Sequence, residues 1–455
     1  MTTTTQLSPL EFEPAIPTEE ITLDDIARTI QERAIHTVEI GFADIPGVLR
    51  GKRVPAKHFL KTAHHGVVIC KAALAWDIQC EVFPGIDLAS FENGYPDMVA
   101  KPLWHTFREV PWRPGSAFLL AEPYTEHGDR IDEAPRAVLQ GVLDRANALG
   151  YRPLIGAELE FYLLSAERTP LYAGIQCYSL YKGTELEFIL REIRLALDAL
   201  GIPVEAANPE YGPAQVEINL EYGDALTVAD QTVLFKHAVK EIARQHGLFA
   251  SFMPKPWSEE SGNGFHVHQS LWDPERRTNL FDADDAIAQH YLAGLLATAR
   301  EFLALEAPSV NAYKRYRDHS FAPTNVSWGG DNRTVSTRAL LGIGAGSRIE
   351  HRTGSSDANP YLIIAANIAA GLYGITHALQ PPASHFAQNA YLDDNAALLP
   401  GTLHAALELL SGSTAAREFF SERFLQHYLG IGRHEVALFD RAVTDWERDR
   451  YLEMA

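Results

Sequence analysis

Glutamate and histidine side chains recur at a spacing of two along strand-like stretches of the sequence. The stretch IGAELEFYLL places Glu158 and Glu160 on one face of a strand, because successive side chains alternate between faces. The stretch NGFHVHQSL does the same for His266 and His268. A solvated strand face, or ordinary core and surface histidines, would explain either pair by itself. Neighbouring carboxylates on a buried strand instead require a cation between them.

Further carboxylates and arginines follow the same pattern. NPEYGPAQVEINL carries Glu210 and Glu217 on either side of a Gly-Pro turn, and SRIEHRTGS aligns Arg348, Glu350 and Arg352 on one face. DNRTVSTRA adds Arg333 and Arg338. Oxygen-rich ligand sets favour Mg²⁺ or Mn²⁺, and arginines beside such ions indicate phosphate. Because no GxxxxGK[ST] loop is present, these residues predict a nucleotide–metal site built on sheet strands.

Composition narrows the class of protein. The 455 residues exceed one ordinary core, so more than one domain is expected. The 59 acidic against 39 basic residues give a net charge of −20, which disfavours binding to nucleic acid or to an anionic membrane. Three cysteines without a CxxC pair indicate neither a disulfide framework nor a thiolate zinc site. Without a long apolar run or a signal peptide, a cytoplasmic location is expected.

The elements that must position the site fall into two expected domains. Residues 1–20 read as a disordered tail and residues 21–125 as a small mixed domain, with a helix over 22–35 capped by Thr22 and a strand around 38–42. Residues 126–455 are expected to form the catalytic domain, opening with a helix that starts at Pro135. The closing stretch 434–455 predicts one amphipathic helix.

Seven motifs occur in the order seen in the glutamine synthetase family, which the chain resembles over residues 35–455. They are GAELEFYL, EYGPAQVE, GNGFHVHQSL, NAYKR, NRTVSTR, RIEHR and DANPYL. The resemblance implies an α+β fold, in which a β-grasp-like domain precedes a catalytic domain with an antiparallel sheet funnel. It also implies homo-oligomers, usually dodecamers of two hexameric rings, with active sites between subunits. ATP would phosphorylate the γ-carboxylate of L-glutamate, and an amine would then displace phosphate to form an amide.

The resemblance also implies roles for individual residues and two to three Mg²⁺ or Mn²⁺ ions in each site. One metal would be held by Glu160, Glu210 and Glu217, and a second by Glu158, His266 and Glu350. His268 and Ser270 resemble ATP-phosphate contacts, and Arg333, Arg338 and Arg348 resemble phosphate-binding arginines. Arg315, Arg352 and Gly262 resemble glutamate contacts. Asp44 resembles an aspartate that enters the neighbouring subunit's site and takes a proton from the amine; a turn-initiating Asp before Pro-Gly is its other interpretation.

The sequence departs from the ammonia-using members at two points. Where they carry a flap glutamate in a pattern of the form YEAP, this chain has Ser320-Phe321-Ala322-Pro323. Near residues 75–80 the stretch AWDIQC replaces the family's usual Phe-Asp-Gly-Ser, which brings Trp76 into consideration as an amine-pocket residue. Less charge and more apolar surface favour an alkyl, hydroxyalkyl or aryl primary amine over ammonium. The chain then resembles the γ-glutamylamide synthetase branch.

Other interpretations stay open at this point. A true glutamine synthetase would tolerate Phe321 as a flap variant, and a γ-glutamylpolyamine synthetase would need further carboxylates for distal charges. An inactive scaffold conflicts with the complete ligand set, and a phosphagen-type kinase would not use Asp44. Tyr391, in NAYLDD, is interpreted as a solvent-exposed loop residue rather than a site of regulation.

Overall fold

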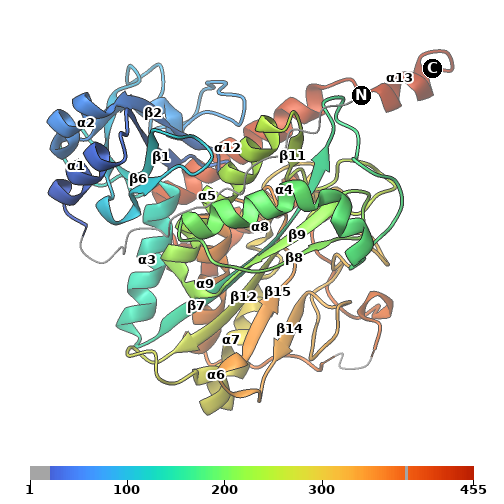
Figure 1. Cartoon of the computed structure of the whole chain (residues 1–455). Helices are drawn as coiled ribbons and strands as arrows, with labels where there is room; N and C mark the ends of the chain where they lie inside the picture. The colour runs from blue at the N-terminus through green and yellow to red at the C-terminus, as the bar shows by residue number, and fades with distance from the viewer. Residues whose placement is uncertain (1–20, 385–387) are drawn as a thin grey trace.

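The computed structural model describes residues 21–384 and 388–455. It contains two sheets with helices packed around them (Figure 1). The tail expected over residues 1–20 lies outside the described residues. The division into domains near residue 125 stays a prediction, although the two sheets draw their strands from either side of that point.

The amino-terminal sheet has the order β2-β1-β6-β4-β3, with β5 paired to β6. β1 and β6 run parallel, and the other pairs are antiparallel. Helix α1 (Leu23–Glu32) begins where the sequence predicts, because Thr22 and Asp25 form a reciprocal capping box. The strands and the second helix of this region are β1 (Thr37–Ala43), β2 (Leu49–Pro55), α2 (Ala56–Thr62), β3 (Val67–Cys70), β4 (Asp97–Pro102), β5 (Arg108–Glu109) and β6 (Ser116–Thr125).

The larger sheet has the order β13-β14-β15-β12-β7-β9-β8, and β10 and β11 pair with β7. All its pairs are antiparallel except β13 with β14. Its strands are β7 (Arg152–Leu164), β8 (Val204–Pro209), β9 (Gln215–Leu220), β10 (Gly223–Asp224), β11 (Phe249–Ser251), β12 (Phe265–Trp272), β13 (Trp328–Gly329), β14 (Thr337–Leu340) and β15 (Arg348–His351). The antiparallel α+β fold implied by the resemblance is therefore present.

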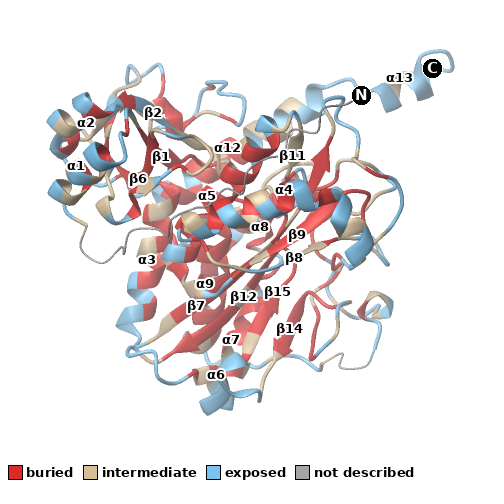
Figure 2. Cartoon of the chain, in the orientation of Figure 1, coloured by how far each residue is buried: buried red, intermediate tan, exposed pale blue. Residues whose placement is uncertain are grey.

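Helices cover one face of this sheet. Helix α9 (Pro360–Thr376) is buried along nearly its whole length and packs against α3, α5 and α7 (Figure 2). The helix has apolar residues on all its sides, as expected for a helix that is surrounded by other elements. The other helices of this layer and its surroundings are α3 (Pro135–Ala148), α4 (Leu180–Ala199), α5 (Ala225–Gln245), α6 (Leu280–Ala283), α7 (Asp285–Thr298), α8 (Leu303–Glu306), α10 (Leu403–Gly412) and α11 (Thr414–Phe419).

The single helix predicted for residues 434–455 is wrong. The chain instead forms α12 (Glu422–Arg441) and then α13 (Asp445–Tyr451), which projects from the body of the molecule (Figure 1). Thr444 explains the break, because its side chain accepts a hydrogen bond from the backbone N–H of Glu447 while the Glu447 carboxylate accepts from Thr444. This capping box starts a new helix where the apolar periodicity continues without interruption.

Candidate active site

The strand register brings the predicted ligands onto one face of the larger sheet. Glu158 lies opposite His266, and Glu160 lies opposite Glu217. Glu350 of β15 lies between His268 of β12 and Arg338 of β14. Residues directly opposite in an antiparallel pair point to the same side, so a spacing of two on each strand produces one continuous polar surface.

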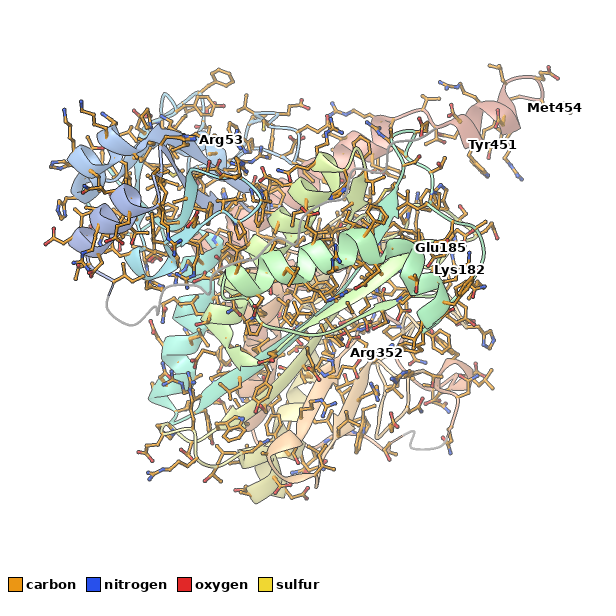
Figure 3. All side chains as sticks on the ribbon, viewed as in Figure 1. Arg53, Lys182, Glu185, Arg352, Tyr451 and Met454 are labelled. Atoms are coloured by element: carbon orange, nitrogen blue, oxygen red, sulfur yellow. The ribbon has the colours of Figure 1, made fainter. Side chains whose placement is uncertain are left out.

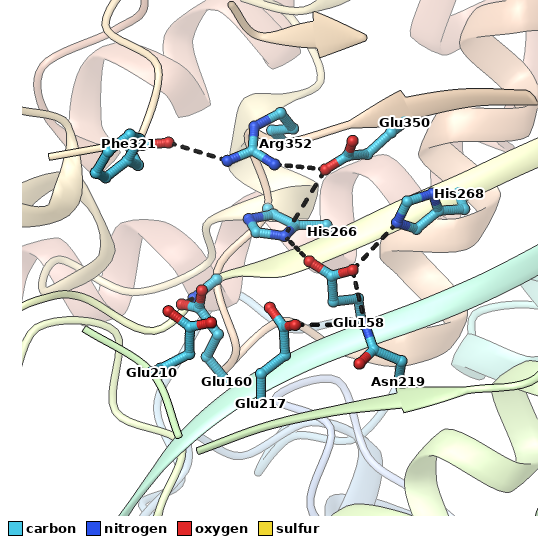
Figure 4. A network of polar contacts seen from close by, with 12 residues as sticks. Glu158, Glu160, Glu210, Glu217, Asn219, His266, His268, Phe321, Glu350 and Arg352 are labelled. Carbon is cyan, nitrogen blue, oxygen red and sulfur yellow. Dashed lines mark hydrogen bonds and ion pairs between the residues drawn. The ribbon is translucent and has the colours of Figure 1, made fainter. Parts of the chain in front are cut away.

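Glu158 is the centre of this surface. Its carboxylate lies 2.6 Å from Nδ1 of His266 and 3.3 Å from Nε2 of His268, and it accepts a hydrogen bond from Nδ2 of Asn219 at 2.8 Å (Figure 4). Burial acts to raise the pKa of Glu158, but the hydrogen bonds from His266 and His268 hold it well below its usual value. This carboxylate is therefore kept ionised.

The other glutamates lie beside Glu158, and Glu210 and Glu217 have no hydrogen bonds or charges that outweigh the effect of burial on their pKa values. Burial, followed by the negative charges of the surrounding glutamates, raises the pKa of Glu217 to about 11. Burial and then the charge of Glu160 raise the pKa of Glu210 to about 7. Such mutual repulsion is relieved by a cation placed between the carboxylates.

The donor set fits divalent metal ions. Ligand atoms of Glu158, Glu217 and His266 lie within 4.8 Å of one another, and so do those of Glu158, Glu350 and His268. The family resemblance implied that Glu158, His266 and Glu350 hold one ion, whereas in the structure Glu158 belongs to both groups and His268 is added. Carboxylate oxygens with one imidazole are ligands suited to Mg²⁺ or Mn²⁺.

Three predicted arginines line the site with unpaired nitrogens. Arg315, Arg338 and Arg352 are buried, and the Nε atom of each has no hydrogen-bond partner among the described residues. Arg338 and Arg352 both contact the Glu350 carboxylate. Burial acts to raise the pKa of Glu350, but the charge of Arg352 is the strongest opposing influence, and this pKa is lowered to about 2. Buried guanidinium N–H groups without a partner fit an anionic ligand.

Two adjoining cavities share this surface. The larger, about 650 Å³, is lined by His268, Ser270 and Arg348, and the smaller, about 260 Å³, by Arg315, Arg333 and Arg352. Glu158, Tyr178 and Glu217 line both. Glu158 and Glu217 therefore lie where the two compartments meet, as a transfer reaction between two bound substrates requires.

Gly262 also lines the smaller cavity, where it permits close packing. A Cβ atom at this position would lie 2.7 Å from Cγ of Arg315, so a larger residue would displace the arginine side chain. The Gly262 carbonyl accepts a hydrogen bond from Nε2 of Gln215 at 2.9 Å. The backbone here is held in place beside the predicted glutamate contacts.

Phe321 lies at the mouth of the smaller cavity. Its side chain is 46% exposed, and its backbone has a φ of 59°, a conformation uncommon for residues other than glycine. Nη2 of Arg352 donates a hydrogen bond to the Phe321 carbonyl at 3.3 Å (Figure 4). The flap segment Ser320–Phe321–Ala322 is thus tied to one of the buried arginines.

The interpretation of Tyr391 as a solvent-exposed residue is wrong. Its side chain is half-buried in the short 3₁₀ helix Ala390–Leu392, and its hydroxyl donates to the Ala322 carbonyl at 3.0 Å. Burial raises the pKa of Tyr391 to about 12. The sequence around Tyr391 is polar and turn-rich, so its contact with a flap about 70 positions earlier leaves no local signal.

Asp44 and Trp76 line neither of the two cavities of their own chain. Asp44 is buried beside Arg50, whose Nε lies 2.7 Å from Oδ2, and the guanidinium of Arg50 lies over the Trp76 ring at 5.4 Å. Burial is the largest influence on Asp44 and raises its pKa to about 6 despite the charge of Arg50. The structure groups these three residues with one another in the amino-terminal region.

Sequence reasoning missed several residues that line the two cavities, with Asn219 in the larger one. Asn219 follows the same spacing of two after Glu217 and could have been found by that rule. Cys177, Tyr178, Tyr211 and Ser261 lie in loops and turns, where no periodicity marks them.

Comparisons with known proteins agree with this geometry. The model for "Glutamine synthetase, catalytic domain" matches residues 132–451. The glutamate–isopropylamine ligase of a Pseudomonas species is 37% identical over 93% of this chain and 96% of its own length. The γ-glutamylethanolamide synthetase of Streptomyces coelicolor is 38% identical over 92% and 93%, respectively. A solved structure of a GmaS/ADP complex superposes with a TM-score of 0.84 at 30% identity, covering 94% of this chain and 99% of that one.

The antiparallel sheet, the ligand-type residues on its surface and these matches define the class of protein, a ligase of a family whose members use ATP and divalent metals. The chain belongs to the glutamine synthetase family. The resemblance drawn from the seven motifs is confirmed, including the likeness to the branch that makes γ-glutamylamides. Members of this family generally use ATP and divalent metals. Among the described residues, no helix is long and apolar enough to span a bilayer.

Proposed function

We propose that the enzyme joins the γ-carboxylate of L-glutamate to a small organic primary amine, with ATP converted to ADP and phosphate. The observation that carries this proposal is Phe321, which presents an apolar ring at the mouth of a cavity whose lining includes five glutamates and four arginines. An apolar substituent on the amine stabilises binding when it covers this ring, whereas ammonium has no apolar surface to bury. The names of two relatives, an isopropylamine ligase and an ethanolamide synthetase, support the same substrate class.

The two cavities suit the two larger substrates. The 650 Å³ cavity, with His268, Ser270 and Arg348, would receive ATP, and its phosphates would point toward the shared glutamates. The 260 Å³ cavity, with Arg315, Arg352 and Gly262, would hold the carboxylates of L-glutamate. Two to three Mg²⁺ or Mn²⁺ ions would bind at Glu158, Glu160, Glu210, Glu217, His266 and Glu350. When bound, such ions neutralise charge on the transferring phosphoryl group.

The chain's own residues would then act in two steps. In the first, the γ-carboxylate oxygen attacks the γ-phosphorus of ATP, the bond to ADP breaks, and Arg333 and Arg338 stabilise the spreading negative charge. In the second, the amine nitrogen attacks the acyl carbon, a C–N bond forms, and phosphate leaves with the C–O bond electrons.

The attacking amine must lose its proton, and Asp44 is suited to accept it. A carboxyl group whose pKa burial raises to about 6 is a competent base near neutral pH. Because Asp44 and Trp76 line neither cavity of their own chain, this role requires a neighbouring subunit. We therefore propose that the protein forms a homo-oligomer, and we expect a dodecamer of two hexameric rings. The cytoplasmic location also stays a prediction.

The test is phosphate release across a panel of ammonium, methylamine, ethanolamine, isopropylamine, aniline and putrescine, with glutamate and amine each omitted in turn. The proposal predicts release that needs both substrates and is fastest with a monoamine that carries an alkyl, hydroxyalkyl or aryl group. Fastest release with ammonium would indicate a glutamine synthetase, and fastest release with putrescine a polyamine enzyme. Absence of release with every amine would indicate an inactive scaffold.

A further inference from the structure

A second aromatic side chain lies beside Phe321 at the mouth of the smaller cavity. The rings of Tyr211 and Phe321 have centroids 5.8 Å apart and planes inclined at 58°. Both line the cavity, and both are half-exposed, at 44% and 46%. Aromatic pairs at this distance attract each other, and each ring still presents a free apolar surface.

The backbone that carries Tyr211 is fixed by close packing. Tyr211 follows Glu210 in the turn between β8 and β9, and its N–H donates to the Glu210 carboxylate at 3.1 Å. A Cβ atom on Gly212 would lie 2.0 Å from the hydroxyl oxygen of Tyr162, so a residue with a side chain is excluded there. That hydroxyl is itself held by the Ser261 carbonyl at 2.7 Å. The Tyr211 ring therefore stands on a rigid turn.

Phe321 approaches from a different part of the chain. Its segment is anchored by Arg352 at the Phe321 carbonyl and by Tyr391 at the Ala322 carbonyl. Two independently anchored segments thus bring two apolar rings to one opening of a highly charged cavity. The metal and phosphate contacts already described need neither ring.

We propose that Tyr211 is a specificity-determining residue that forms, together with Phe321, an apolar clamp on the substituent of the amine. This inference rests on the proposed glutamate–amine ligase function and deepens it. The ammonium end would point into the cavity toward the carboxylates, and the alkyl or aryl group would lie between the two rings. Ligands of this class are primary monoamines whose charge is confined to one end.

The experiment compares the variants Tyr211→Ala and Tyr211→Phe with the wild-type enzyme. For each, kcat/KM is measured with ammonium, methylamine, isopropylamine and aniline at saturating glutamate and ATP. Tyr451→Ala is the matched control, because Tyr451 is 50% exposed and lies on the projecting carboxyl-terminal helix, far from Arg352 (Figure 3). The KM values for glutamate and Mg²⁺ are measured in parallel, since a shift in either would indicate displacement of Glu210.

Tyr211→Ala is expected to lower kcat/KM for isopropylamine and aniline by roughly 5- to 20-fold relative to ammonium, because each buried methylene contributes about fourfold. Tyr211→Phe and Tyr451→Ala are expected to keep the wild-type ratios. Combined with Phe321→Ala, the loss is expected to be less than the product of the single losses, because the rings act on one substituent.

Equal losses for ammonium and for the larger amines would overturn the inference, as would a loss explained by KM for Mg²⁺. The proposed function fails separately. It is refuted if the wild-type enzyme itself prefers ammonium, whereas the role of Tyr211 is refuted if the wild-type enzyme prefers organic amines and Tyr211→Ala leaves that preference unchanged.

Discussion

Replacing Phe321 with glutamate should shift the enzyme from organic amines toward ammonium. The substitution exchanges a half-exposed phenyl ring for a carboxylate at the mouth of the 260 Å³ cavity. Arg333, Arg338 and Arg352 line the same cavity and would keep the new carboxylate ionised. An ammonium ion would gain a charged hydrogen-bond partner, and an alkyl group would lose part of its apolar contact.

The size of the shift follows from these two changes. Isopropylamine can bury up to three carbons, about 2.4 kcal/mol if all are covered, and Phe321 supplies one of two rings, so its loss removes about 1 kcal/mol. A charged hydrogen bond contributes about 1.5–3 kcal/mol, and solvent at the cavity mouth favours the lower value. The sum is about 2.5 kcal/mol, which corresponds to a change of roughly 70-fold in the ratio of isopropylamine to ammonium kcat/KM.

The assay is product formation with isopropylamine and with ammonium, measured for the wild-type enzyme, Phe321→Glu, Phe321→Gln and Phe321→Leu. Gln has the shape of Glu without its charge, and Leu keeps an apolar side chain. Only Phe321→Glu should raise kcat/KM for ammonium, and Phe321→Leu should stay nearest to the wild-type ratio. The reasoning is refuted if Glu and Gln variants behave alike, or if the ratio stays within twofold of wild type.

Three further predictions test other parts of the account. Glu217→Gln removes a carboxyl group whose pKa is raised to about 11, so the stability that this group contributes to the metal-free wild-type protein is lost as pH rises above the usual glutamate range. The Tm of the metal-free variant at pH 8 should therefore equal or exceed that of the metal-free wild type, while the rise in Tm on adding Mg²⁺ should be smaller in the variant. A lower Tm for the metal-free variant would contradict this prediction. Asp44→Asn should lower kcat/KM for the amine by about 10²- to 10⁴-fold. In the wild-type enzyme, kcat/KM should fall below about pH 6 because the protonated Asp44 carboxyl cannot accept the amine proton, and the variant should lack this fall. An unchanged pH profile of kcat/KM in the variant would exclude Asp44 as the base. Tyr391→Phe removes the hydrogen bond to Ala322 and should raise glutamate-dependent phosphate release without amine by roughly 2- to 10-fold, whereas Tyr451→Phe should not.

Much of the candidate metal and phosphate site could be predicted from the sequence, since most of its residues lie on strands. Because side chains alternate along a strand, Glu158 and Glu160 lie on one face of β7, and His266 and His268 lie on one face of β12. The pairing of β7 with β12 and β9 then places these faces on the same side of the sheet. Register itself cannot be read from a single strand, because it depends on which strands pair. For this reason the sequence could not show that Glu158 lies between both histidines.

The amine side was less accessible to sequence reasoning because loops build it. Phe321 was found through a departure from the family pattern, but its partner Tyr211 lies in a turn over 100 positions earlier, where nothing indicates a contact. Tyr391 was misjudged for the same reason. At the carboxyl end, one residue, Thr444, outweighed the helical periodicity by forming a cap.

The central claim is that an organic amine is preferred over ammonium, and direct competition between the two tests it most simply. The enzyme is given ATP, Mg²⁺ and glutamate with equal concentrations of isopropylamine and ammonium, and the two amides are quantified by mass spectrometry. The ratio of initial rates equals the ratio of kcat/KM values. The account predicts an excess of γ-glutamylisopropylamide over glutamine; an excess of glutamine would contradict it.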